Sequence, residues 1–168
     1  MIDLVDSVKA IAMDVDGVLT DGTFWWGSNG EELKRFCFAD MTGLSMAMRS
    51  GIKIALISGE SSPAGMALVQ RFADKLKITD VYKGCHDKAA AIRDFAERNQ
   101  IQLSAICFIG DDFIDVPAMA VAGLAVAPAD AQPVAKSKAR LVTVHSGGHG
   151  AVREVVDAIL KHRTLRDS

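Results

Sequence analysis

The sequence predicts an α/β protein: a doubly wound, Rossmann-like parallel sheet with one β-hairpin inserted after the first strand. Short apolar runs alternate with segments of helical periodicity, a pattern that implies parallel βαβ units. Polar residues follow directly on several of these runs, as they do where parallel strands end at a binding crevice. The chain shows no internal repeat and no linker, so residues 1–168 are expected to form a single domain.

Local signals place each element. Pro63 stands where a helix can begin and Gly51 where one can end, while short apolar runs bounded by polar residues indicate strands. The expected elements are, in order, a strand at 8–12, a hairpin over 23–38, a helix over 40–50, a strand at 52–57, a helix over 63–76, a strand at 81–82, a helix over 87–98, a strand at 103–109, a helix over 116–122, a strand at 124–127, a helix over 129–137, an apolar segment at 141–144 and a helix over 150–160.

The hairpin is expected because Asn29-Gly30 separates two strand-like runs. Four aromatic side chains give this ribbon more apolar surface than two strands can bury by themselves. They pack either on the domain's own body or on a partner subunit, as an exposed apolar patch would. The four residues are Trp25, Trp26, Phe36 and Phe38.

Composition narrows the classes of function. A formal net charge of -2 without a basic patch argues against a nucleic acid partner. No apolar run approaches the roughly 20 residues of a membrane span, and the first residues lack a secretory signal, so we expect a cytoplasmic protein with no membrane partner. The three cysteines lie far apart without a CxxC pair, which predicts neither a disulfide framework nor a thiolate zinc site.

Two carboxylates stand where the first strand should end. Asp14 and Asp16 lean to the same side of a strand, whereas Val15 points back toward the core. Adjacent acids repel unless one is protonated or a cation lies between them, so the pair indicates metal binding or acid/base chemistry. Asp and Gly after a strand can also form a simple turn, and the later strands decide between the two interpretations.

The later strands also end in polar residues at the same edge of the sheet. Turn chemistry alone does not explain several carboxylates, a hydroxyl and an ammonium in one place. Carboxylates are ligands for Mg²⁺ and can act as nucleophiles, while a hydroxyl and an ammonium can hold phosphoryl oxygens, so the set predicts phosphoryl transfer. Besides Asp14 and Asp16, the set consists of Ser58, Gly59, Lys88, Asp111, Asp112 and Asp115.

These residues resemble, in order, the four motifs of the haloacid dehalogenase (HAD) superfamily. DVDGV at 14–18 resembles the first motif, Ser58-Gly59 the second, Lys88 the third and GDDFID at 110–115 the fourth. The resemblance implies a HAD-type fold and a Mg²⁺-dependent phosphatase that forms a phosphoaspartate.

The same resemblance implies a role for each residue. Asp14 would be the nucleophile and a metal ligand, Asp16 the acid/base that also lends the metal its backbone carbonyl, and Asp111 the last metal ligand. The other implied roles are phosphate binding by Ser58, Gly59 and Lys88, and support of these groups by Asp112 and by Asp115, which would orient Lys88 or a metal-bound water.

The resemblance extends to the small branch of that superfamily without a cap domain, which includes 3-deoxy-D-manno-octulosonate 8-phosphate phosphatases. VDGVLTDG at 15–22, the aromatic hairpin and SGGHGAVRE at 146–154 carry it. It implies a 2-keto-3-deoxy sugar acid phosphate from lipopolysaccharide or sialic acid biosynthesis as the substrate. It also implies a homotetramer in which the hairpins join the subunits and a neighbour covers the site. The residues that would contact the substrate are Asp40, Glu60 and Arg153.

Departures from the branch pattern leave the sugar acid open. Octulosonate phosphatases typically carry Arg after Ser-Gly, whereas Glu60 stands here, as in the nine-carbon KDN 9-phosphate group. The alternative to an octulosonate phosphatase is therefore a KDN 9-phosphate or N-acylneuraminate 9-phosphate phosphatase of the same branch. Glu60 would accept hydrogen bonds from hydroxyl or amine groups. The next helix is about one turn longer than the branch pattern, so either Arg71 or Lys75 would take its basic position. For Arg153, an ion pair is the alternative to a substrate carboxylate.

Two other classes of function compete with a phosphatase. A receiver-type signalling domain is also a small doubly wound fold with an acidic pocket around Mg²⁺. Its phosphate-accepting Asp ends a middle strand, however, where this chain has Ser58. A module that kept the fold without turnover would have no reason to hold repelling acids together. The spacing therefore favours the phosphatase.

Overall fold

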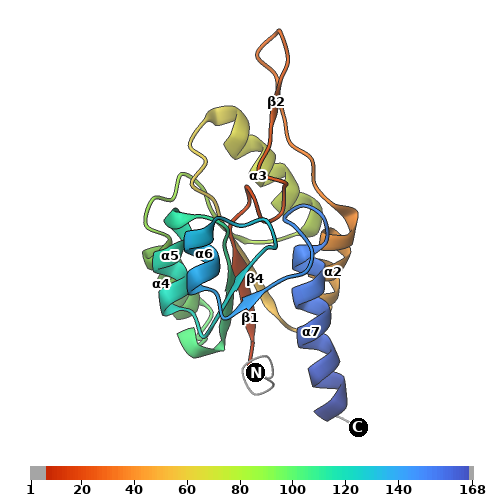
Figure 1. Cartoon of the computed structure of the whole chain (residues 1–168), viewed down its shortest axis with the longest axis vertical. Coiled ribbons are helices and arrows are strands. Elements are labelled where there is room, and N and C mark those ends of the chain that lie inside the picture. Colours follow the sequence, from red (N-terminus) through yellow and green to blue (C-terminus); the bar gives the residue numbers. More distant parts are fainter. Residues whose placement is uncertain (1–6, 167–168) are drawn as a thin grey trace.

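The computed structural model describes residues 7–166. Six parallel strands form one sheet in the order β5-β4-β1-β6-β7-β8, and helices cover both of its faces (Figure 1). This is the doubly wound α/β fold that the sequence predicts. The strands are β1 (Ala10–Met13), β4 (Lys53–Ile57), β5 (Asp80–Tyr82), β6 (Ile106–Ile109), β7 (Leu124–Ala127) and β8 (Leu141–Val142).

Helices connect the strands. They are α2 (Phe38–Arg49), α3 (Pro63–Leu76), α4 (Lys88–Arg98), α5 (Val116–Val121), α6 (Pro133–Lys138) and α7 (Ala151–Arg166), with 3-10 turns η1 (Leu103–Ala105) and η2 (Phe113–Asp115). Side chains cap the two helices that begin at the site: the Ser62 hydroxyl accepts from the Gly65 N–H at 3.0 Å, and Asp87 from the Ala90 N–H at 2.9 Å. No helix within residues 7–166 has the length and apolar character needed to cross a membrane.

The strand order reverses at β1. Its neighbours are β4 on one side and β6 on the other, so Met13 lies level with both Leu56 and Ile109. From β1 the sheet extends through β4 to β5 on one side and through β6 and β7 to β8 on the other. The connections leave β1 in opposite directions, which opens a crevice outside its carboxyl end. The residues that follow β1, β4 and β6 therefore meet at this edge.

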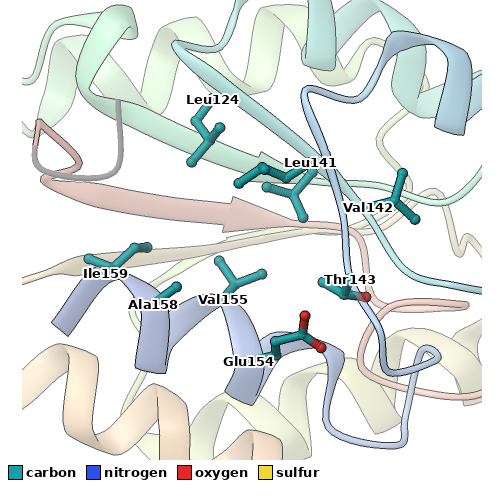
Figure 2. A pocket seen from close by; sticks show the side chains of 9 residues that line it. Leu124, Leu141, Val142, Thr143, Glu154, Val155, Ala158 and Ile159 are labelled. Carbon is teal, nitrogen blue, oxygen red and sulfur yellow. The ribbon is translucent and has the colours of Figure 1, made fainter. Parts of the chain in front are cut away.

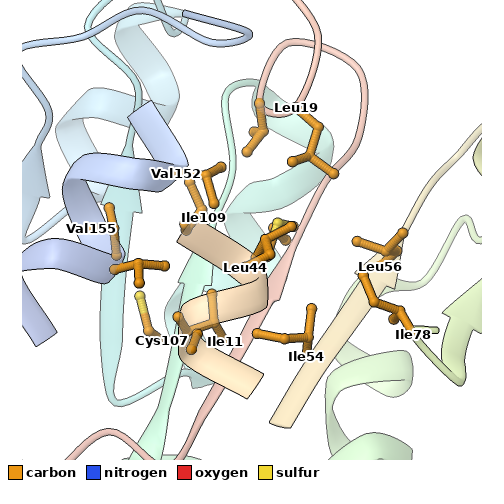
Figure 3. Packing of buried hydrophobic residues seen from close by; sticks show 14 of the residues in the cluster. Ile11, Leu19, Leu44, Ile54, Leu56, Ile78, Cys107, Ile109, Val152 and Val155 are labelled. Carbon is orange, nitrogen blue, oxygen red and sulfur yellow. The ribbon is translucent and has the colours of Figure 1, made fainter. Parts of the chain in front are cut away.

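Two apolar cores lie on opposite faces of the sheet. Ile11 and Met13 of β1 face α2, α3 and α7, where Leu44 packs against them (Figure 3). Ala10 and Ala12 face α4, α5 and α6. Because helices bury both faces, all four residues of β1 are apolar and 0% exposed. The first polar side chain after such a strand can only lie at its end.

Several elements differ from the prediction in extent, and three outside the hairpin differ most. The strand expected over 103–109 begins only at Ile106, because the three residues before it form η1. The helix expected over 129–137 begins at Pro133, since proline fits the first helical turn, where its missing N–H costs nothing. The last helix continues to Arg166. None of these differences moves the carboxyl end of a central strand.

The hairpin stands apart from the large sheet and its strands are shorter than expected. β2 (Trp25–Trp26) and β3 (Glu32–Leu33) pair antiparallel and project beyond the body of the molecule (Figure 1). The tryptophans of β2 are 69% and 73% exposed, whereas Phe36 at the hairpin base stacks on Phe72 of α3 with ring centroids 4.6 Å apart. The base of the ribbon thus packs on the domain's own body, and its tip does not.

Helices α2 and α7 pack side by side over one face of the sheet (Figure 1). Gly43 permits this approach, because a Cβ there would lie 3.0 Å from Cδ of Arg153. Asp40 of α2 is 1% exposed and accepts hydrogen bonds from the N–H groups of Gly150 at 3.2 Å and of Arg153 at 2.8 Å. The carboxylate therefore caps the start of α7 and holds the loop before it in place.

Candidate active site

Asp14 is the first polar residue after β1. Its N–H donates to the carbonyl of Ile109 at 3.0 Å, which continues the β1–β6 ladder, and Val15 turns into the core with 0% exposure. The Asp14 carboxylate is buried. Its Oδ1 accepts from the N–H of Val15 at 2.7 Å and lies 2.9 Å from Nζ of Lys88. These two contacts of Oδ1 fix the orientation of the carboxylate.

Lys88 is a buried cation between two acids. It begins α4, its side chain is 1% exposed, and its Nζ lies 2.7 Å from Oδ1 of Asp115 as well as 2.9 Å from Asp14. The other oxygen of Asp115 accepts from the N–H groups of Asp111 at 2.9 Å and of Asp112 at 3.2 Å. Asp115 therefore orients Lys88 and also shapes the loop after β6.

Asp111 approaches the loop after β1 closely. Gly17 has a φ of +86°, and a Cβ there would overlap the Asp111 carboxylate, so only glycine fits. Oδ1 of Asp111 is buried, and no residue between 7 and 166 donates a hydrogen bond to it. One oxygen from each of Asp14, Asp111 and Asp115 lies within 4.8 Å of the others. Hard carboxylate oxygens, one of them lacking a partner, fit Mg²⁺.

The electrostatics of this cluster also favour a bound cation. Burial, and then the charge of Asp115, raise the pKa of Asp14 to about 7 in spite of Lys88. Burial, and then the charges of Asp14 and Asp115, raise the pKa of Asp111 to about 8. One ammonium does not balance three carboxylates, two of them buried, and a divalent cation would supply the missing charge.

Ser58 and Gly59 follow β4 at the same edge. Ser58 is 0% exposed, its N–H donates to the carbonyl of Tyr82 at 2.8 Å, and its hydroxyl accepts from the N–H of Glu60 at 3.1 Å. The hydroxyl hydrogen is thereby available for a phosphoryl oxygen. A Cβ at Gly59 would lie 3.7 Å from the carbonyl of Cys85, which is an ordinary van der Waals distance.

Asp16 has a partner that the sequence reasoning missed. Nζ of Lys34 lies 2.9 Å and 3.0 Å from the two carboxylate oxygens of Asp16, and 3.2 Å from Oε2 of Glu60. Lys34 directly follows β3, so the base of the hairpin enters the site. In the sequence Lys34 is one of several charged residues close together, and no motif distinguishes it. In the structure its side chain is distinguished by an exposure of only 2%.

The loop before α7 has contacts of its own. The Glu154 carboxylate accepts from the N–H of His145 at 3.0 Å and lies 2.7 Å from its ring Nδ1. Nε2 of His149 lies 2.8 Å from the guanidinium of Arg35, which also pairs with Asp21 at 3.2 Å. Both histidines thus have partners in the loop or the hairpin and stand outside the acid cluster.

Three predicted site residues have other partners. Asp40 was expected to contact the substrate; it is buried, and both of its oxygens accept backbone hydrogen bonds as a cap of α7. Nε of Arg153 pairs with Asp157 at 2.8 Å, the ion pair that was the alternative to a substrate carboxylate. The Asp112 carboxylate caps η2.

Two hollows are not lined by the acids of the cluster. One, of about 380 Å³, lies between the hairpin base, α2 and α3; Arg71 and Lys75 line it, and so does Lys34, the partner of Asp16. The other, of about 100 Å³, lies between β8 and α7 and is mostly apolar, with Leu141 and Val155 among its lining residues (Figure 2). Its carboxylate, Glu154, is held by the loop. Neither hollow offers the groups of phosphoryl transfer.

Comparison with known sequences agrees with this geometry. Residues 64–155, more than half of the chain, match the profile of the haloacid dehalogenase-like hydrolases. The chain is 41% identical over 155 residues to the 3-deoxy-D-manno-octulosonate 8-phosphate phosphatase KdsC of Escherichia coli K12, which covers 92% of this chain and 80% of that protein. The phosphatase of the same name from Yersinia pestis is 42% identical over 154 residues, with the same coverage.

Solved structures show the same relationship. The octulosonate 8-phosphate phosphatase of Moraxella catarrhalis, determined with magnesium, phosphate and KDO, superposes with a TM-score of 0.92 at 36% identity over 99% of this chain and 93% of that one. The cobalt-bound enzyme of Haemophilus influenzae gives 0.89 at 35% identity over 96% and 92%. The family predicted from the motifs is confirmed: this chain is a hydrolase of the haloacid dehalogenase-like family, in the branch of the 3-deoxy-D-manno-octulosonate 8-phosphate phosphatases.

Proposed function

We propose that this protein is a Mg²⁺-dependent phosphatase that hydrolyses 3-deoxy-D-manno-octulosonate 8-phosphate through a phosphoaspartate at Asp14. One observation carries the proposal: Lys88 joins Asp14 to Asp115 beside the unpartnered oxygen of Asp111. A nucleophile, a phosphate-binding cation and a set of hard metal donors thus meet where the strand order reverses. The names of the relatives supply the substrate.

The two acids that follow β1 have different roles in the reaction: Asp14 is the nucleophile and Asp16 the acid/base. Asp14 attacks the phosphorus, the ester P–O bond breaks, and Asp16 gives its proton to the leaving oxygen. Asp16 then takes a proton from water, the water attacks the phosphoaspartate, and the P–O bond to Asp14 breaks to release phosphate. Ser58 and Lys88 hold the non-bridging oxygens as charge develops on them. The Asp16 side chain is 37% exposed, which suits proton exchange with water.

Asp14, Asp111 and the backbone carbonyl of Asp16 would hold the Mg²⁺. When bound, the ion neutralises charge on the phosphate and on the buried acids. Both oxygens of Asp115 already carry hydrogen bonds, so its part is to orient Lys88. Asp112 supports the loop as the cap of η2.

Glu60 supports an alternative, nine-carbon substrate. Its carboxylate stands next to Asp16 through their shared contact with Lys34, and it cannot pair with the carboxylate of a sugar acid. This residue is the observation that favours a nine-carbon substrate, KDN 9-phosphate or N-acylneuraminate 9-phosphate. The named relatives favour the eight-carbon acid.

We also propose that the protein is a cytoplasmic homotetramer joined by its hairpins. Phe24 and the two tryptophans of β2 are between 50% and 73% exposed, and such apolar surface on a projecting ribbon favours burial against other copies. The hollow lined by Arg71 and Lys75 at the hairpin base lies next to this surface. Light scattering on the purified protein tests the assembly: a mass four times that of the chain is expected, and a monomer contradicts it.

A turnover screen tests the reaction and the substrate separately. Phosphate release is measured from octulosonate 8-phosphate, KDN 9-phosphate, N-acetylneuraminate 9-phosphate and glucose 6-phosphate, each with Mg²⁺ and with EDTA. We expect the highest kcat/KM for the octulosonate ester and no turnover in EDTA. A preference for a nine-carbon ester corrects the sugar, and a preference for glucose 6-phosphate removes the substrate class. EDTA-resistant turnover overturns the metal mechanism.

A further inference from the structure

Lys34 occupies an unusual place for a lysine on a projecting hairpin. Its side chain is 2% exposed, and its Nζ lies within 3.2 Å of the carboxylates of both Asp16 and Glu60. A long, flexible cation normally remains in water, so this burial needs the two strong partners that it has. Burial alone lowers the pKa of Lys34, but Asp16 and Glu60 outweigh it and raise that pKa. The lysine is therefore charged at neutral pH.

The surroundings of Lys34 contain more acceptors than donors. Glu32 is a third carboxylate, with Oε1 3.8 Å from Nζ of Lys34, and its Oε2 accepts from the indole N–H of Trp26 at 3.2 Å. Within residues 7–166, Oε1 of Glu32 is buried without a hydrogen-bond partner. Three carboxylates around one ammonium leave a local excess of negative charge. This surface suits hydroxyl groups, which donate, and repels a carboxylate.

Glu60 is held rigidly in this arrangement. Its Oε1 accepts from the N–H of Ser62 at 2.8 Å, and a Cβ at Gly65 would overlap its carboxylate, so α3 approaches it closely. Its Oε2 faces Lys34 at 3.2 Å. The Lys34–Glu60 pair thus offers an ammonium donor and a carboxylate acceptor side by side, which complements neighbouring hydroxyl groups that both accept and donate.

The position of the pair relative to the reaction decides which hydroxyls it can reach. Asp16, the proposed proton donor to the leaving oxygen, touches Lys34 directly. The carbon atoms of the alcohol next to the ester must therefore lie beside this pair. We propose that Lys34, together with Glu60, recognises the hydroxyl groups on the carbons adjacent to the phosphate ester, and that the substrate carboxylate points away from this cluster. The inference rests on the proposed function and assigns to Lys34 a role in specificity.

Two matched pairs of substrates test the inference. One pair is octulosonate 8-phosphate and its 7-deoxy analogue; the other is glycerol 3-phosphate and propyl phosphate. The octulosonate pair differs in one hydroxyl, on the carbon next to the ester-bearing carbon, and the glycerol pair differs in the hydroxyls of the next two carbons. The wild-type enzyme is expected to prefer the hydroxylated member by about tenfold or more in kcat/KM. In Lys34→Met this preference should fall to about threefold or less, mainly through KM. Glu60→Gln is the second variant and should lower the same ratio.

The ratio separates recognition from other effects of the substitution. Lys34→Met also removes a partner of Asp16, and that loss lowers turnover of both members of a pair equally. Lys83→Met is the matched control, because Lys83 is exposed and pairs with Gln70 on the surface. It should keep the wild-type ratio.

Each outcome has a distinct meaning. The inference is overturned if the wild-type enzyme does not discriminate within the pairs, or if Lys34→Met keeps the wild-type ratio. If octulosonate 8-phosphate is not hydrolysed while glycerol 3-phosphate is, the proposed substrate fails, and the glycerol pair alone decides on Lys34. Collapse of the ratio in Lys34→Met but not in Lys83→Met supports the assignment.

Discussion

The molecule pairs a lysine with two acids in two places, and the two settings differ. In the body, Lys88 lies between Asp14 and Asp115, whose side chains are 6% and 0% exposed. At the hairpin base, Lys34 lies between Asp16 and Glu60, whose side chains are 37% and 22% exposed. The first group is sealed between a strand end and a helix start. In the second group, water reaches the carboxylates of Asp16 and Glu60.

This difference in burial suits the two groups to different parts of the substrate. In both groups burial alone lowers the pKa of the ammonium, and the carboxylates raise it above its usual value. The sealed group has no water to compensate for a lost partner, so it must stay complete and suits an invariant part of the substrate, the phosphoryl group. The open group can exchange a carboxylate partner for a substrate hydroxyl at lower cost, which suits the variable part.

The largest expected effect comes from the body group. Asp14→Asn keeps the shape of the side chain but removes the nucleophile, so kcat should fall on the order of 10⁴-fold or more. Phosphate release under saturating substrate measures it. Asp74→Asn, on the outer face of α3 where Asp74 pairs with Gln70, is the control and should stay within about twofold of wild type. Wild-type turnover in Asp14→Asn would refute the phosphoaspartate.

Next in size is the contrast between the two lysines in stability. Lys88→Met leaves Asp14 and Asp115 buried without a cation and should cost about 3–5 kcal/mol of unfolding free energy. Lys34→Met should cost about 1–2 kcal/mol, because the carboxylates of Asp16 and Glu60 are already partly exposed to water. Urea unfolding at pH 8 measures both. The Lys88→Met loss should shrink at pH 5, where the acids can take up protons. Equal losses in the two variants would contradict the comparison.

A third expectation concerns pH and metal. In the metal-free protein the pKa of Asp14 is raised to about 7 and that of Asp111 to about 8, whereas both are near 4 in the unfolded chain. The folded state therefore binds more protons between these values, and its stability falls as pH rises from about 4 to 8. Mg²⁺ at about 100 times its Kd should restore about 2.7 kcal/mol at pH 8 and less at pH 5.

Thermal unfolding with Mg²⁺ or EDTA across that pH range measures this third effect. An Asp111→Asn variant should lose most of the Mg²⁺-dependent rise in Tm at pH 8, because it removes the carboxylate with the unpartnered oxygen. A rise in Tm that is larger at pH 5 than at pH 8 would reverse the expected sign.

The smallest expected effect concerns the tip of the hairpin. Trp25 is 69% exposed, so Trp25→Ala should change the unfolding free energy of the isolated chain by about 0.5 kcal/mol or less. Phe108→Ala, in the body at 0% exposure, should cost about 3–5 kcal/mol. Light scattering of Trp25→Ala should show loss of the assembled form. An unchanged mass would separate this residue from the interface.

The central part of the fold was predictable because its signals are local. β1 and β4 are short apolar runs that end at polar residues, β7 is a short apolar run that ends at a proline, and helices α3 and α4 begin at a proline and at a capped lysine. The largest errors in the body lie at the start of β6 and of α6, where a 3-10 turn and a proline shift the boundary, and at the end of α7. Pro133 is a local signal for the start of α6, whereas helix and strand ends without such a residue are only weakly encoded in the local sequence.

The candidate site was predictable where residues stand next to strand ends. Asp14, Ser58, Lys88 and Asp111 could be placed at one edge because parallel strands present their carboxyl ends together. The capping role of Asp40 could not be predicted, because its partners are backbone N–H groups more than a hundred positions away. The place of Lys34 in the site could not be predicted either, since nothing in a two-residue strand indicates that the following lysine turns inward.

By itself the sequence determined the fold class, the order of the four motifs and the acids at the edge of the sheet, because periodicity and strand ends are properties of adjacent residues. It also posed the question of how Asp14 and Asp16 coexist. Only the tertiary structure answered it: each acid has its own lysine, Lys88 from α4 and Lys34 from the hairpin. The pairing of charges depends on distances across the fold, and only the packed structure sets those distances.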